Sequence, residues 1–304
     1  MKKNKRISLL IVAFLLMGFL VACNGSDGNI KVYTRDTSSG TRDGFFTSIG
    51  LNDAVKSNEL LAKGYIEVQS NGAMVTQVKN DEHGIGYISL SSLESSGLKG
   101  LTYNSVIPTE ANVINGTYKL TRNFNYMLRD EYADDNVEAV AKALQAYMTS
   151  IEGVGVIQGA DGIVDATGAK AWSIIKVDHP VVDDTTLNIT FRVGGSTSVE
   201  KVGKALTSAF AQLVAGTITF EHEHTGSGDA WKRTNGGEKD GAASLDLGFA
   251  SREFKTDEAA ATTGTIAIDA IVVVVNTKNS LTAVTAEDLV KIFKGKTSKW
   301  SELN

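Results

Sequence analysis

The chain has 304 residues, with 35 acidic and 30 basic side chains and a formal net charge of −5 at pH 7. A net acidic protein is a poor candidate for nucleic-acid binding, because a basic surface supplies most of the affinity for the phosphate backbone. The sequence contains one cysteine, which excludes an intrachain disulfide. Its length is enough for one large domain or two lobes.

The beginning of the chain has the pattern of an export signal. Basic residues precede the apolar run 7–20, which is short for a membrane span, and small residues follow it. We predict a signal peptide over residues 1–22, with a retained membrane-anchor helix as the alternative. Cys23 lies in a sequence that resembles a bacterial lipobox, which implies lipidation of Cys23. Residues 23–29 would then be the polar linker of a lipid anchor, and the protein would be extracytoplasmic, tethered to the bacterial cell membrane.

The first predicted strand leads into a loop with several anion donors. Residues 30–34 have strand character, and a helix is expected after Arg35, Ser39, Gly40 and Thr41. The first N–H groups of a helix have no partner inside it and carry partial positive charge. Gly40 permits close approach, the hydroxyls add donors, and the guanidinium fork suits an oxyanion. The loop predicts an oxyanion site, and an ordinary helix cap is the alternative.

The remainder of the first half alternates strands with helices, which indicates an α/β protein. Glycines and polar ends in residues 161–184 indicate a connector or ornament. Strands are expected at 65–69, 85–90 and 120–128, and helices at 58–63, 73–80 and 137–149.

The second half repeats the strand–turn–helix arrangement. Glycine occurs with serine or threonine at three such junctions, 39–41, 195–198 and 227–228. Open α/β sheets bind ligands in crevices at the carboxyl ends of their strands, so the junctions predict a shared site. Scattered helix caps are the alternative. Strands are expected at 187–193, 217–223 and 266–275, and helices at 199–215 and 286–293.

These junctions resemble the phosphate-binding lipoproteins that feed bacterial phosphate ABC transporters. The resemblance implies a two-lobed α/β periplasmic-binding-protein fold, type II-like. It also implies a monomeric binding protein, not an enzyme, that captures inorganic phosphate without a cofactor or metal and delivers it to ABC permease subunits. The matching stretches are 32–42, 85–88, 194–198, 226–228, 246–252, 266–269 and 281–300.

The order of these stretches differs from the family order. The family's Gly-Ser-Thr-Ser unit comes first there, whereas here it follows the Ser-Gly-Thr-Arg unit. We predict a circular permutation whose new ends lie in one surface loop. One lobe is expected over residues 30–116 and 279–304. The second is expected over 117–278, with the connector 161–184 joining the family's usual ends.

The resemblance also assigns the phosphate donors. They lie on two lobes, so closure is favourable with ligand bound. One lobe supplies Arg35, Ser39, Gly40 and Thr41, and the other supplies Ser196, Thr197, Ser198, Ser227 and Ser251.

Selection of phosphate over sulfate requires a carboxylate that accepts the phosphate proton. Some family members place this aspartate after a Gly-Ala-Ser sequence, where this chain has Arg252. Asp246 and Asp269 are the substitutes, with Asp269 preferred; the alternative for Asp269 is a polar strand end. Arg252 is expected to be a second anion donor or a surface ion pair.

The two histidines at 222 and 224 alternate with glutamates on one predicted strand, so both face the same way. Two imidazoles are too few for a closed zinc site, and a solvated strand face is the preferred interpretation.

Three further functions stay open. The first is a receptor for sulfate, molybdate or arsenate. The second is a secreted phosphatase, which needs a metal cluster or an activated nucleophile that the four histidines do not indicate. The third is a regulatory or adhesive surface lipoprotein with a vestigial site.

Overall fold

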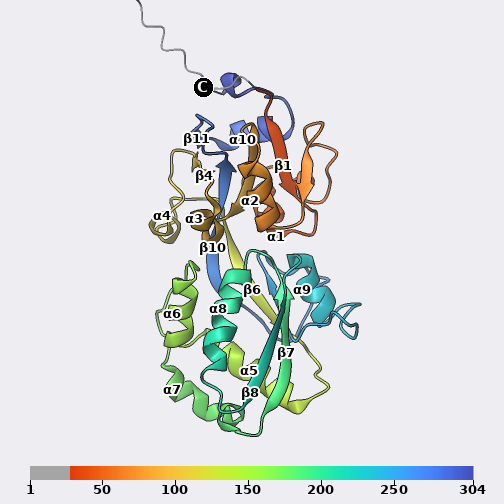
Figure 1. Ribbon diagram of the computed structural model, residues 1–304, viewed down its shortest axis with the longest axis vertical. Helices are drawn as coiled ribbons and strands as arrows, with labels where there is room; N and C mark the ends of the chain where they lie inside the picture. The colour runs from red at the N-terminus through yellow and green to blue at the C-terminus, as the bar shows by residue number, and fades with distance from the viewer. Residues whose placement is uncertain (1–27, 304) are drawn as a thin grey trace, which may run out of the picture.

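The computed structural model describes residues 28–303, so the predicted signal peptide, Cys23 and most of the predicted linker lie outside the described residues. Two α/β lobes lie along the long axis, and strands β6 (Thr121–Leu128) and β10 (Thr263–Val275) run between them (Figure 1). The two-lobed α/β architecture implied by the sequence is confirmed. Within residues 28–303, none of the helices has both the length and the apolar character needed to cross a membrane.

The first lobe carries the Arg35 loop and packs its sheet between two apolar clusters. Side chains of β10 alternate between them, with Val272 and Val274 in one and Ile271 and Val273 in the other. This double coverage explains the continuous apolar run in the sequence. The strands are β1 (Lys31–Arg35), β2 (Ile66–Val68), β3 (Gly84–Ser89), β4 (Lys99–Gly100), β5 (Thr102–Tyr103) and β11 (Ala283–Val284). The helices are α1 (Gly40–Ser48), α2 (Asn71–Lys79), α3 (Leu93–Ser96), α4 (Glu110–Ile114) and α10 (Ala286–Phe293).

The second lobe has its own core, in which helices α5, α6 and α8 cover a sheet. Phe191, Phe210 and Phe249 are fully buried there. The strands other than β6 and β10 are β7 (Asn188–Gly195), β8 (Thr217–Glu223) and β9 (Leu247–Ala250). The helices are α5 (Asp135–Met148), α6 (Ile151–Gly159), α7 (Trp172–Ile175), α8 (Glu200–Ala211) and α9 (Ser227–Thr234). The 3₁₀ turns of both lobes are Asn52–Val55, Leu90–Ser92, Lys176–Asp178, Pro180–Asp183 and Trp300–Glu302.

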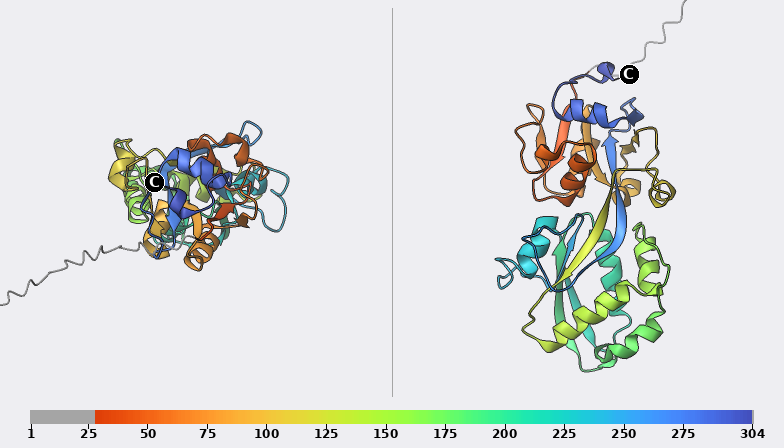
Figure 2. Two further views of the ribbon diagram at one scale, coloured as in Figure 1. Left: turned by 90° about the horizontal axis from the view of Figure 1, so that it is seen from above. Right: turned by 180° about the vertical axis from the view of Figure 1, so that it is seen from behind.

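One path of hydrogen-bonded strands passes through both lobes, in the order β2-β1-β3-β10-β6-β9-β7-β8, with β4 beside β10 and a separate β11-β5 pair. Strand β10 pairs antiparallel with β6 as far as Ala270 and with β3 from Ile271 onward. The two long strands run together from one lobe into the other (Figure 2). The lobe limits at 116/117 and 278/279 remain a prediction. Strand β10 passes from the core of the second lobe into the core of the first lobe near Ala270.

The two ends of the described chain lie side by side in the first lobe. Asn29 forms a β-bridge with Lys299, and the Ile30 N–H donates to the Ser298 carbonyl at 2.7 Å. Adjacent ends are what a circular permutation requires, and the permutation itself stays a prediction.

Several segments differ from the sequence expectations. Residues 58–63 form turns rather than a helix, because tertiary contacts such as the Ala62 N–H to the Phe293 carbonyl override local propensity. Helix α6 was not expected, since glycines dilute its apolar pattern, but Ser150 caps it by accepting from Gly153 N at 3.0 Å. The connector 161–184 contributes Trp172 to the second core, where its ring lies 5.4 Å from that of Tyr147.

Candidate functional site

Helix α1 begins where β1 has ended and faces the second lobe. Ser39 caps the helix, with its Oγ accepting from the Arg42 N–H at 3.4 Å. Gly40 and Thr41 are the first helical residues, so their N–H groups have no acceptor inside the helix. All three predicted donors are buried. The junction therefore offers a partial positive charge in a site removed from water.

The Arg35 side chain is 1% exposed and is the cation of the site. Its Nη2 donates to the Gln69 carbonyl at 2.8 Å and to Thr197 Oγ1 at 3.3 Å. Its Nη1 lies 3.4 Å from both Thr41 Oγ1 and Asn71 Oδ1, at the long end of hydrogen bonding. The Nε is buried without a hydrogen-bond partner. Burial lowers the pKa of Arg35 to about 10, which leaves it charged at neutral pH.

The second lobe contributes hydroxyls from three separate junctions. Ser196 follows β7, Ser227 begins α9 and Ser251 follows β9. The Oγ atoms of Ser196 and Ser251 are 2.9 Å apart, and those of Ser227 and Ser251 are 3.2 Å apart. The Ser251 N–H also donates to Ser227 Oγ at 3.0 Å. Because β7 and β9 are parallel neighbours, their carboxyl ends bring these junctions together.

The two lobes contact each other through these donors. Thr41 Oγ1 lies 3.0 Å from Ser198 Oγ, which also accepts from Asn71 Nδ2 at 3.1 Å. Gly228 N–H donates to the Ser38 carbonyl at 3.2 Å. The structure thus brings together the nine donor residues predicted from the junctions and adds Asn71. Asn71 was missed although a signal was present, since Ser70 and Gly72 flank it at another strand–turn–helix junction.

At Gly40 the two lobes approach each other too closely to admit a side chain. A Cβ atom built there would lie 2.5 Å from Ser227 Oγ, 2.6 Å from Ser251 Oγ and 2.8 Å from the Ser251 carbonyl. Real Cβ contacts are longer than this, so the closed arrangement requires glycine.

Asp36 supplies a carboxylate that the sequence argument missed. Its Oδ1 accepts from the Ser38 N–H at 2.9 Å and from the Ser38 hydroxyl. Its Oδ2 is buried without a hydrogen-bond partner, 3.8 Å from Arg35 Nη2. A signal was present, since an aspartate directly follows the site arginine. Asp36 therefore combines a free acceptor with a position beside the site cation.

Asp269 is held at the crossing of the long strands. Its Oδ2 accepts from Arg122 Nε at 3.0 Å and Nη2 at 2.7 Å, and its Oδ1 accepts from Ser89 Oγ at 2.6 Å. Burial raises the pKa of Asp269, while Arg122 and Ser89 act in the opposite direction. Both carboxylate oxygens are thus committed to a buried ion pair that joins β6, β10 and the end of β3.

Asp246 lies away from the donors. It directly precedes β9, whereas Ser251 directly follows that strand, so the two are separated by the strand's length. Its Oδ2 accepts from the Arg192 N–H at 2.7 Å, and burial raises its pKa. The structure therefore does not place Asp246 in the cluster.

Arg252 and Arg42 are both occupied by other partners. Arg252 forms a two-pronged pair with Glu258 at 2.6 and 2.7 Å, and both side chains are buried. Of the two roles expected for Arg252, anion donor or surface ion pair, the structure shows an ion pair, but it lies in the interior. Arg42 donates to the carbonyls of Arg35 and Ala54, both at 2.6 Å, which fixes the loop that precedes α1.

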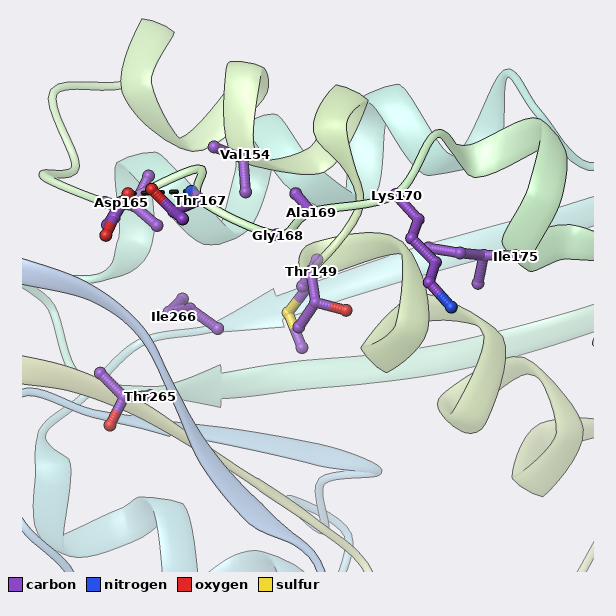
Figure 3. A pocket seen from close by; sticks show the side chains of 12 residues that line it. Thr149, Val154, Asp165, Thr167, Gly168, Ala169, Lys170, Ile175, Thr265 and Ile266 are labelled. Carbon is purple, nitrogen blue, oxygen red and sulfur yellow. Dashed lines mark hydrogen bonds between the residues drawn. The ribbon is translucent and has the colours of Figure 1, made fainter.

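Two cavities are candidate positions for a ligand beside or apart from this cluster. One, of about 410 Å³, is bordered by Asn71 and Thr197 and so adjoins the donors. The other, of about 400 Å³, lies beside the connector, with Asp165 and Lys170 at opposite ends of it (Figure 3). The second cavity is lined by Lys170 and three threonines but includes no arginine and none of the residues of the Arg35 cluster. Among the described residues, no group of three or more His, Cys, Asp or Glu side chains could hold a metal ion.

Comparisons with known proteins identify relatives along the whole chain. Residues 23–152 and 180–304 match the family model described as the PBP superfamily domain. Phosphate-binding protein PstS 2 of Streptococcus agalactiae serotype V is 30% identical over 315 residues, covering all of both chains. PstS 2 of Streptococcus pneumoniae serotype 4 is 29% identical over 318 residues, again covering both chains completely.

A solved structure gives the same answer. The phosphate-binding protein of a phosphate ABC transporter from Streptococcus pneumoniae TIGR4 matches with a TM-score of 0.65 and 28% identity, over 91% of this chain and 100% of that one. Sequence and structure agree with the resemblance seen at the junctions. The chain belongs to the PBP superfamily and, within it, to the family of the phosphate-binding proteins PstS.

Proposed function

We propose that this protein captures inorganic phosphate between its two lobes and delivers it to the permease of an ABC transporter. The observation that carries the proposal is the buried Arg35 guanidinium, with its unpartnered Nε, surrounded by hydroxyls from both lobes. The named relatives are binding proteins, in keeping with the expectation that the chain is not an enzyme.

The donor set suits a tetrahedral oxyanion. The fork of Arg35 can bind two oxygens, and the start of α1 supplies backbone N–H groups. Ser198 and Ser227 supply hydroxyls from the opposite side. Hydrogen bonds to an ionised partner are about twice as strong as neutral ones, so buried neutral donors can hold the anion with a single cation.

The two lobes are expected to close on the anion because the donors are divided between them. Neither lobe holds the full set, so the closed form is stabilised when an anion engages both lobes at once. Thr41 and Ser198 already contact each other in the closed arrangement, at 3.0 Å. The phosphate would exchange these contacts for bonds to its own oxygens.

We propose Asp36 as the carboxylate that selects phosphate. Phosphate near neutral pH retains a P–O–H group, which can donate to the free Asp36 Oδ2, whereas sulfate has no proton to donate. The negative charge of the carboxylate also repels a fully ionised anion. Asp269 and Asp246, the carboxylates proposed from the sequence, have other partners.

The remaining proposals concern the setting of the protein. We propose cleavage after residue 22, lipidation of Cys23, a monomer on the outer face of the membrane, and a circularly permuted chain order. The adjacency of Asn29 and Lys299 supports the permutation. The lipid anchor lies outside the described residues.

Binding calorimetry with phosphate, sulfate, molybdate and arsenate tests the proposal. We expect phosphate to bind more tightly than sulfate, and Arg35→Ala to abolish both. Tighter sulfate binding would make the protein a sulfate receptor, and absence of binding to all four would favour a non-transport surface lipoprotein. Turnover of a phosphate ester by the purified protein would indicate a phosphatase.

A further inference from the structure

His222 and His224 form a hydrogen-bonded row that ends at the anion site. Thr207 Oγ1 on α8 lies 2.9 Å from His222 Nε2. His222 Nδ1 lies 3.2 Å from His224 Nε2, and His224 Nδ1 lies 3.0 Å from the Ser196 carbonyl. The expected solvated strand face is therefore wrong, because this face of β8 packs on α8 and on the loop that carries Ser196. We call the two side chains the histidine pair.

The chemistry of the partners fixes the direction of the row. The Ser196 carbonyl can only accept, so His224 Nδ1 carries the hydrogen. A neutral His224 then accepts at Nε2, and His222 must donate from Nδ1. His222 Nε2 is left as an acceptor for the Thr207 hydroxyl. Both imidazoles are neutral in this arrangement, and every ring nitrogen has a partner.

Ser196 is the residue through which the row acts on the site. Its N–H donates to the Phe249 carbonyl at 2.7 Å, and its Oγ contacts Ser251 Oγ and accepts from the Ser198 N–H at 3.2 Å. The Ser196 carbonyl accepts from His224 Nδ1 and, at 3.3 Å, from the Val199 N–H, so the bond from His224 is one of two that orient it. A carbonyl turned toward the site would repel the anion.

The row can take up one proton without losing a hydrogen bond between its members. Protonated His222 Nε2 donates to Thr207 Oγ1, and the Thr207 hydroxyl turns to the Gly203 carbonyl, 3.1 Å away. The bonds from His222 to His224 and on to Ser196 are unchanged. A second proton on His224 Nε2 would face the His222 N–H and break the row.

The charges around the histidine pair are balanced. Glu200 and Lys204 of α8 face it and bind each other at 2.6 Å. Glu221 and Glu223 alternate to the opposite face, where each pairs with an arginine. Burial lowers the pKa of His224, and burial, His224 and Lys204 lower the pKa of His222 to about 4. The pair is therefore neutral at pH 7, and a nearby bound anion favours its protonation.

We propose that His222 and His224 are positioning residues for the anion-binding loop: His224 fixes the Ser196 carbonyl, and the pair takes up one proton at His222 Nε2 that strengthens anion binding at acid pH. The proposal rests on the proposed function, since the anion is phosphate. It makes affinity depend on a side chain that does not touch the ligand.

Phosphate calorimetry between pH 6 and pH 4.5, where phosphate is almost entirely the monoanion, tests the proposal. We expect the ratio of wild-type to His222→Gln affinity to rise from about one to at least threefold as the pH falls. Proton uptake on binding at pH 4.5 should be smaller in His222→Gln. His179→Gln is the matched control, because burial also lowers the pKa of His179, which lies on the connector, and it should keep the wild-type profile.

The positioning role has its own variants. His224→Ala should weaken phosphate binding about tenfold at both pH values, in line with the loss of one hydrogen bond. His224→Gln, whose amide can donate to the Ser196 carbonyl, should restore affinity at pH 6. A pH-independent ratio for His222→Gln, or wild-type affinity in His224→Ala, overturns the proposal. A wild-type protein that binds no phosphate at pH 7 overturns the proposed function as well.

Discussion

The variant Gly40→Ala is expected to impair closure of the lobes without impairing folding. The added Cβ would lie 2.5 to 2.8 Å from Ser227 and Ser251 atoms of the opposite lobe, so the closed form must open. Gly40 is the first residue of α1, where alanine is well tolerated in a helix, so we expect the unliganded protein to keep its stability. The variant should fold normally and bind phosphate poorly.

The size of the loss follows from the donors that opening removes. Hydrogen bonds to a charged group contribute about 1.5 to 3 kcal/mol each. If opening weakens two of the second-lobe donors, the loss is about 3 kcal/mol or more, which corresponds to at least about 100-fold in Kd. Calorimetric titration with phosphate measures the affinity, and thermal unfolding without phosphate measures the stability.

Gly72→Ala is the matched control. Gly72 also lies near the start of a helix in the first lobe, but a Cβ there meets nothing closer than Ser70 Oγ at 3.8 Å. It should bind phosphate as the wild type does. A Gly40→Ala protein with affinity within threefold of the wild type would refute the claim that closure at this contact holds the anion.

Four other predictions concern Arg35, Asp36, the buried ion pair of Asp269 and the titration of His222. Arg35→Ala should lose at least about 100-fold in phosphate affinity and Arg35→Lys about tenfold, because lysine keeps the charge but not the fork, as calorimetry can measure. Asp36→Asn should lower the phosphate-to-sulfate affinity ratio by about tenfold or more; an unchanged ratio would remove Asp36 from selectivity. Asp269→Ala should lower the free energy of unfolding by about 3 to 5 kcal/mol, measured with denaturant, because it leaves Arg122 buried and unpaired. The double variant Arg122→Met/Asp269→Leu should lower it less than this single change. The pKa of His222 is lowered from 6.5 to about 4 in the folded protein, so its contribution to stability is present above pH 6.5 and lost as the pH falls toward 4. The free energy of unfolding of His222→Gln should therefore fall less than that of the wild type between pH 6.5 and pH 4.

The grouping of the candidate donors could be predicted from the sequence because the signals are local. A strand end, a glycine and a hydroxyl side chain lie within a few residues of each other at Ser39, Ser196 and Ser227, and of these three Ser39 alone caps a helix. The parallel neighbours β7 and β9 bring the junctions of Ser196 and Ser251 to one edge, and the Ser39 junction meets them from the other lobe. The alternation of β8 likewise placed both histidines on one face.

The partners of buried charges could not be predicted in the same way. Asp269 meets Arg122 because the antiparallel register of β10 and β6 sets them opposite each other, across 147 positions of sequence. The preference for Asp269 over Asp246 as the selecting carboxylate did not foresee this pairing. The helix expected at 58–63 failed for a similar reason, since distant residues bind that segment's backbone.

A crystal structure of the protein with phosphate tests the central claim most directly. We predict one phosphate between the lobes, within hydrogen-bonding distance of Arg35, Thr41, Ser198 and Ser227, with its protonated oxygen beside Asp36. A phosphate bound by the donors of one lobe alone, or bound away from Arg35, would contradict the two-lobed site described here.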